Sequence, residues 1–181
     1  MLLQLRAMGQ MACVEGLRRS NDRSAQYGLT LTEPQIQALV WRRQEALAEA
    51  GRVEFGEGAL PQLIAAFCDS PYLCQANYEE TLAELLVLFY HFKNESRDRL
   101  SDGEVIAGMK RIFDGPAQGA VELLADAPPE ALTDPDLKTM ERQSFLPLSV
   151  NWTSEFLPIY NKVIPWGWNP TNENPVSPYP L

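Results

Sequence analysis

The distribution of proline divides this chain into two parts that cannot adopt the same kind of structure. Seven of the 14 prolines lie in the 37 residues from Phe145 onward, which also hold three of the four tryptophans and only three charged residues. Because proline lacks a backbone N–H and its ring clashes with the preceding helical turn, it forbids a long helix there. We therefore predict a body over residues 1–144 and an irregular Pro/Trp-rich tail over residues 145–181, extended or partly disordered.

Helix signals recur through the body. Thr32 and Gln35 form a capping box, with Pro34 in the first turn, and Ser101 and Glu104 form a second one. Behind the second box, five apolar residues fall within about 120° on a helical wheel: Val105, Ile106, Met109, Ile112 and Phe113. The helices are predicted over about residues 2–20, 32–51, 59–68, 71–97, 101–114, 116–124 and 134–143. The longest is expected to end near Arg97, with Ser70 as the cap that leads into it.

One short strand is the only extended structure that the body suggests. The segment Arg52–Phe55 alternates polar and apolar residues and is followed by Gly56 and Gly58, which suits a strand and a turn. The predicted fold class is therefore mainly α, a compact domain of six or seven helices with almost no sheet.

Net charge and hydropathy exclude some classes of binding partner. The formal charge of -9 opposes binding to phosphate backbones and anionic lipid. The basic pairs at 18–19, 42–43 and 110–111 are scattered, so we interpret them as solvated helix faces rather than a nucleic-acid site. The longest apolar run has six residues, Leu85–Tyr90, against the roughly 20 of a membrane span. With no signal peptide visible at the start, we expect a cytoplasmic protein that binds neither nucleic acid nor membrane.

Four blocks of the sequence resemble a family of short bacterial proteins. The blocks are Gly51–Gly56, Ala66–Tyr72 followed by Asn77 and Tyr78, Phe89–Glu95, and Phe113–Gly119. The resemblance covers about residues 20–125, and the family is a domain of unknown function. It implies a bacterial, cytoplasmic helical protein and carries over no catalytic residue.

His91 is the single histidine and the first residue to test for catalysis or metal binding. A helical wheel places it on a polar side with three carboxylates, namely Glu80, Glu84 and Glu95. Glu84 and His91 lie about 10.5 Å apart along a helix, so one metal ion could not readily bind both. We therefore favour a solvated face with a local His91–Glu95 ion pair and expect no metal or cofactor. The alternative is an enzyme whose site is assembled around Glu84, His91 and Glu95, with Glu80, Tyr90 or Asp69 as further polar groups.

The other reactive groups have simpler interpretations. Cys13, Cys68 and Cys74 show no C-x-x-C spacing, and we expect reduced thiols that pack mostly as small apolar side chains. The turn Gly115–Gly119 lacks the lysine and Ser/Thr of a phosphate loop, so we interpret it as a connection between helices.

The tryptophans suggest contact surfaces. Trp41 lies about 140° around its helix from Ile36, away from the apolar face, and needs a second contact. That contact is another helix of the core, the tail or a partner chain. In the tail, Trp152, Trp166 and Trp168 would each gain from burial. We therefore predict a non-catalytic accessory or regulatory module that contacts a protein partner or forms a homo-oligomer.

Overall fold

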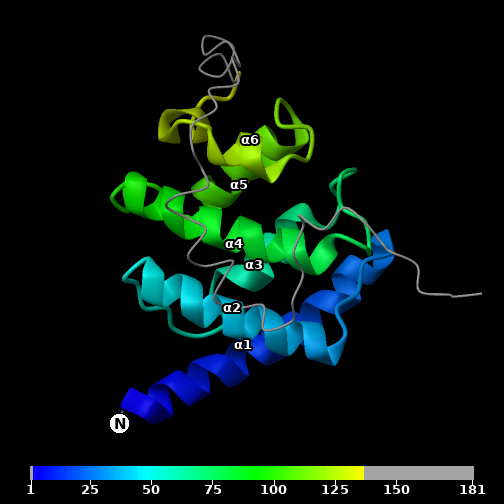
Figure 1. The fold of residues 1–181 in the computed structure, drawn as a ribbon, viewed down its shortest axis with the longest axis vertical. Helices are drawn as coiled ribbons and strands as arrows, with labels where there is room; N and C mark the ends of the chain where they lie inside the picture. Colours follow the sequence, from blue (N-terminus) through cyan, green and yellow to red (C-terminus); the bar gives the residue numbers. More distant parts are fainter. Residues whose placement is uncertain (1, 137–181) are drawn as a thin grey trace, which may run out of the picture. The chain divides into compact units, whose positions relative to one another are not determined.

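The computed structural model describes residues 2–136, with side chains from Gly9 onward, so the predicted tail lies outside the described residues. Within that range the chain forms helices and turns and no strand, which confirms the predicted mainly α fold. Figure 1 shows how these helices are arranged. The elements are α1 (Leu2–Ser24), the 3-10 helix η1 (Ala25–Tyr27), α2 (Glu33–Glu49), α3 (Ala59–Phe67), α4 (Tyr78–Glu95), α5 (Asp102–Asp114), α6 (Val121–Ala125) and the 3-10 helix η2 (Pro129–Leu132).

Both predicted capping boxes are present. The Thr32 backbone N–H donates to Gln35 Oε1 at 2.9 Å, at the start of α2. At the start of α5, the Ser101 N–H donates to Glu104 Oε2 at 2.8 Å and the Glu104 N–H donates to Ser101 Oγ at 3.3 Å. The two helices therefore begin where their own side chains satisfy the free N–H groups of the first turn.

The predicted start of α4 at Ser70 and Pro71 is wrong. Residues 71–77 form turns, and α4 begins at Tyr78. Ser70 Oγ accepts the Tyr72 N–H at 3.4 Å and donates to Asp114 Oδ1 at 2.5 Å, and Asn77 Oδ1 accepts the Cys74 N–H at 2.8 Å. These side chains offer the backbone an alternative to the helix, so α4 is shorter than predicted. At 23 residues against 18, α1 is longer than α4.

Other predicted boundaries also shift. The first helix continues to Ser24 rather than ending at Ser20. The sixth starts at Val121 rather than Pro116, because Gln118 (φ 50°) and Gly119 (φ 84°) adopt positive φ values that a right-handed helix excludes. Residues 134–136 are not helical, and the rest of the helix predicted over 134–143 lies outside the described residues.

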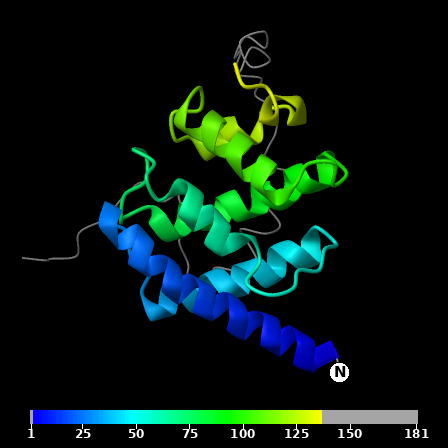
Figure 2. The same ribbon diagram turned by 180° about the vertical axis from the view of Figure 1, so that it is seen from behind.

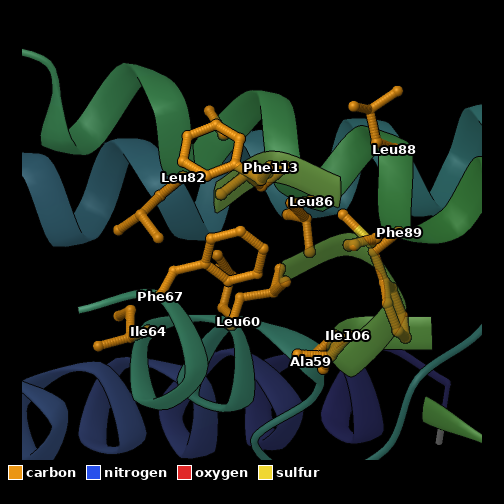
Figure 3. Close-up of a cluster of buried hydrophobic side chains, with 14 of the residues drawn as sticks. Ala59, Leu60, Ile64, Phe67, Leu82, Leu86, Leu88, Phe89, Ile106 and Phe113 are labelled. Atoms are coloured by element: carbon orange, nitrogen blue, oxygen red, sulfur yellow. The ribbon is translucent and has the colours of Figure 1, made fainter. Parts of the chain in front are cut away.

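Helix α4 lies at the centre of the core and contacts α2, α3, α5 and α6. Side chains on several sides of this helix are buried, including Leu82, Ala83, Leu86 and Tyr90. Figure 2 shows α1 running past α2 and α3, both of which it contacts. In the apolar cluster of Figure 3, the rings of Phe67 and Phe113 meet edge to face with centroids 5.5 Å apart.

No helix among residues 2–136 combines the length and apolar character needed to cross a bilayer.

The close contact between α5 and η2 gives a test of the packing. A Cβ atom at Gly108 would lie 2.5 Å from the Leu132 carbonyl oxygen and 2.8 Å from its Cα. Replacing glycine with alanine in a helix ordinarily stabilises by about 0.5–1 kcal/mol. Gly108→Ala should instead lower the free energy of unfolding by about 1–3 kcal/mol, because the backbone of η2 has to move. Urea denaturation measures the difference.

Gly103→Ala is the matched control in the same helix, since nothing lies within 4 Å of its Cβ position. It should be neutral or stabilise by up to about 1 kcal/mol. Equal stability of the two variants would contradict the described packing of α5 on η2.

Candidate functional site

The four sequence blocks that carry the family resemblance meet in pairs in the folded body. Gly51–Gly56 lies against the end of α4, where Arg52 Nη1 donates to Asn94 Oδ1 at 2.7 Å and Asn94 Nδ2 donates to the Ala50 carbonyl at 3.1 Å. The other two blocks meet through the Ser70–Asp114 hydrogen bond and an edge-to-face contact of the Tyr72 and Phe113 rings. The body therefore has two polar junctions, which we call the α4 junction and the α5 junction.

The α5 junction holds a turn in place. Lys110 Nζ lies 2.8 Å from Asp69 Oδ1 and also pairs with Asp114, whose carboxylate accepts from Ser70. The hydrogen bond from Lys110 lowers the pKa of Asp69. A Cβ at Gly119 would collide with the Tyr72 side chain, so the turn Gly115–Gly119 packs tightly here as a connection between helices, as predicted. The charges of Asp69, Lys110 and Asp114 are therefore all paired.

A buried ion pair forms the centre of the α4 junction. Arg43, on α2, is 2% exposed, and its Nε donates to Glu54 Oε2 at 2.8 Å. Glu54 Oε1 accepts the backbone N–H of Ala59, the first residue of α3, at 3.2 Å. The predicted solvated pair at 42–43 is therefore half wrong, because Arg42 is exposed while Arg43 shares the inner face of α2 with its apolar residues. Glu54 makes that burial possible by supplying the opposite charge.

A thiol and a phenol lie beside this ion pair. Burial raises the pKa of the Cys13 thiol, which also interacts with the charges of Arg43 and Glu54. Burial likewise raises the pKa of Tyr90, whose hydroxyl faces Glu54 and Arg43. Burial acts to lower the pKa of Arg43, but its neighbours, among them the hydrogen-bonded carboxylate of Glu54, outweigh burial and raise the value. The thiol and phenol thus stay neutral beside a paired arginine, an arrangement that does not activate a nucleophile.

The connection between α2 and α3 is held to the body by alternate polar side chains. Arg52 pairs with Asp98 and binds Asn94, and Glu54 pairs with Arg43. Further along, Glu57 pairs with Arg19 of α1. The alternation predicted for a short strand is present, but its polar residues face inward and no strand forms within residues 2–136.

The apolar residues of this connection consequently face the solvent. Val53 is 77% exposed and Phe55 is 79% exposed. Gly51 (φ 65°) and Gly56 (φ 71°) bracket the segment in conformations that glycine adopts readily. We call Arg52–Phe55 the display segment. Sequence reasoning identified its alternation but not which set of side chains points outward.

The polar stripe on α4 lies where it was predicted. Glu80, His91 and Glu95 are exposed and Glu84 is half-buried. Among the described residues, no ion pair joins His91 to Glu95, so the local pair that we predicted is not formed. The two further candidates for an enzyme site lie elsewhere. Tyr90 is buried at the α4 junction, and Asp69 pairs with Lys110.

No group of three or more His, Cys, Asp or Glu side chains in the described part of the chain is arranged to hold a metal ion. All three cysteines are free, with Cys13 and Cys68 buried and Cys74 exposed, so the expectation of packing is wrong for Cys74.

Trp41 is 52% exposed on the outer side of α2. It lies two residues before the buried Arg43, which places it about 160° away around the helix. About half of its surface is therefore left uncovered by the described body. The tail candidates Trp152, Trp166 and Trp168 lie outside the described residues.

The model of a family of unknown function (DUF6323) matches residues 16–139. No curated protein and no solved structure matches the chain.

Proposed function

This chain belongs to the DUF6323 family of unknown function, and on that premise we propose that it is a non-catalytic accessory or regulatory module that binds another protein. The observation that carries the proposal is the outward display of Val53 and Phe55 on an anchored segment. The proposed setting is the bacterial cytoplasm, which the family resemblance implies.

The display segment turns its apolar side chains toward the solvent, whereas the hydrophobic effect favours their burial. Burying a valine or phenylalanine side chain is worth about 1.5–3 kcal/mol. The desolvation of an ion pair such as Arg43–Glu54 can exceed the Coulombic attraction that it gains. Single exposed apolar residues are ordinary on protein surfaces. Here, however, two of them lie on one short segment, and its two inward-facing side chains, Arg52 and Glu54, are both held in ion pairs. A partner that covers Val53 and Phe55 would recover their burial energy.

Anchoring also favours binding by lowering its entropic cost. Ordering a loop on binding costs about 1–2 kcal/mol for each residue fixed. The display segment is already tied to α2 through Glu54 and to the end of α4 through Arg52. A preorganised surface loses less free energy on association than a loose one.

The charge of the chain indicates what kind of partner fits. A net charge of -9 repels nucleic acid and anionic membranes and favours a protein surface that carries positive charge. Trp41 offers a second contact surface, because Glu45 lies one turn further along α2 and a cationic side chain can stack on an indole ring.

Substitution of the displayed residues tests the proposal. In affinity capture of the full chain from the cells that naturally produce it, Val53→Ser combined with Phe55→Ser should reduce recovery of a specific partner at least about tenfold, a loss of about 1.4 kcal/mol or more. The circular dichroism spectrum and the free energy of unfolding should stay within about 0.5 kcal/mol of the parent, because both side chains are exposed.

Met11→Ser is the matched control, since Met11 is an equally exposed apolar residue on α1 (73%). Trp41→Ser reports on the second surface. If the same proteins are recovered with the parent, the double variant and Trp41→Ser, the proposal is wrong.

A further inference from the structure

We infer that the display segment accepts an extended, positively charged peptide of the partner protein as an added β-strand. The inference rests on the proposed function and specifies the partner's chemistry and the binding mode. Its evidence is the backbone of the segment rather than the side chains alone.

The backbone of the display segment has free hydrogen-bonding groups. Within the described body, no hydrogen bond reaches the backbone N–H or C=O groups of Val53, Glu54 or Phe55. The flanking N–H groups are occupied, because Arg52 donates to the Leu47 carbonyl at 2.8 Å and Ala59 donates to Glu54 Oε1. The free groups thus include the whole stretch that displays the apolar side chains.

One edge of this stretch is open. Along an extended chain, successive N–H groups point to opposite edges, so the Arg52 and Glu54 N–H groups share one edge and those of Val53 and Phe55 share the other. The first edge faces α2, because the Arg52 N–H is bonded to Leu47 near the end of that helix. The edge of Val53 and Phe55 therefore remains for a partner strand.

An extended peptide matches both features of the segment. Its backbone presents donors and acceptors at the spacing of a strand, and its alternate side chains lie on the same face as Val53 and Phe55. Aromatic and β-branched side chains on neighbouring strands stabilise each other. A helix would satisfy its own backbone groups and leave this edge unpaired.

Charge favours a cationic peptide. The segment lies between two exposed acidic residues, Glu49 at the end of α2 and Glu57 after it. Glu57 pairs with Arg19, whereas Glu49 has no ion pair among the described residues. Lys or Arg residues in the peptide would complement Glu49 and the net charge of -9.

A second copy of the chain does not fit as the occupant. In an antiparallel pair, residues directly opposite each other point to the same face, and strands lie about 4.8 Å apart. Pairing the segment with itself would therefore place both inward-facing Glu54 residues, and both bodies, on one side of the ribbon. Two copies would also repel each other, since each carries a charge of -9.

Selection from a displayed library of short random peptides, with the full chain as bait, tests this binding mode. We expect enriched peptides with apolar residues at alternate positions and a net positive charge. Val53→Ser combined with Phe55→Ser should weaken their binding at least about tenfold, whereas Met11→Ser should not. In the complex, amide hydrogen exchange should slow at least about tenfold at Val53 and Phe55, and not at Glu54.

The inference is overturned if no peptide is enriched, if enriched peptides carry helical rather than alternating spacing, or if binding survives the double substitution. It is also overturned if Glu54 is protected as strongly as its neighbours. Capture of a folded protein that depends on Val53 and Phe55, without any extended peptide, would leave the proposed function standing and remove only this inference.

Discussion

Arg43→Met should lower the free energy of unfolding by about 3 kcal/mol. The substitution keeps most of the side-chain volume but leaves the Glu54 carboxylate without its charge partner in a largely buried place. Removing one member of a buried ion pair costs about 3–5 kcal/mol, and the lower end applies because Glu54 retains some exposure. Arg43 also fills a large volume in the core, so its loss weakens the packing of α2 and of the connection to α3. Guanidinium denaturation monitored by circular dichroism measures the change.

The neighbouring arginine provides the control for Arg43. Arg42→Met alters an exposed side chain of the same type one residue away and should change stability by no more than about 0.5 kcal/mol. Adding Glu54→Gln to Arg43→Met should restore part of the loss, because no uncompensated charge then remains. If Arg43→Met is as stable as Arg42→Met, the ion pair does not hold the display segment in place.

Gly58→Ala should destabilise the body by about 3–5 kcal/mol. Gly58 has φ 76° and ψ -163°, a region that is essentially restricted to glycine, where another residue costs about 1–3 kcal/mol. A Cβ at this position would also overlap Glu54 Oε2 and lie 2.7 Å from Arg43 Nη2, so the ion pair would have to move. The thermal unfolding midpoint should fall sharply.

Gly56→Ala separates the two causes. Gly56 also has a positive φ of 71°, but nothing lies within 4 Å of its Cβ position. Gly56→Ala should therefore lower the free energy of unfolding by only about 1–2 kcal/mol, the cost of holding alanine at a positive φ. A Gly58→Ala variant no less stable than Gly56→Ala would show that the side chains around Gly58 are not packed as described.

Local interactions explain the parts of the fold that could be predicted. A capping box needs only residues three apart, so Thr32 with Gln35 and Ser101 with Glu104 marked the starts of α2 and α5 correctly. The apolar face of α5 could also be predicted, because a helical wheel depends only on the spacing of residues along the chain. Its five predicted residues, Val105, Ile106, Met109, Ile112 and Phe113, are all buried.

Contacts between distant residues explain the boundaries that were wrong. Ser70 Oγ accepts the Tyr72 N–H, as a cap would, but its hydroxyl also donates to Asp114, 44 positions away, and the residues that follow form turns. No local pattern marks that contact, so α4 begins at Tyr78 instead.

In the candidate site, too, some features follow from the local sequence and others from contacts between distant residues. The alternation of Arg52–Phe55 and the glycines around it are visible in the order of residues, as is the off-face position of Trp41. The direction in which the segment faces depends on Arg43, 11 positions before Glu54, and on Asn94, 42 positions after Arg52. Periodicity separates two faces but does not say which of them meets the core. Only the folded arrangement of α2 and α4 places charged partners beneath the segment, so that Arg52 and Glu54 turn inward and Val53 and Phe55 are left for a partner.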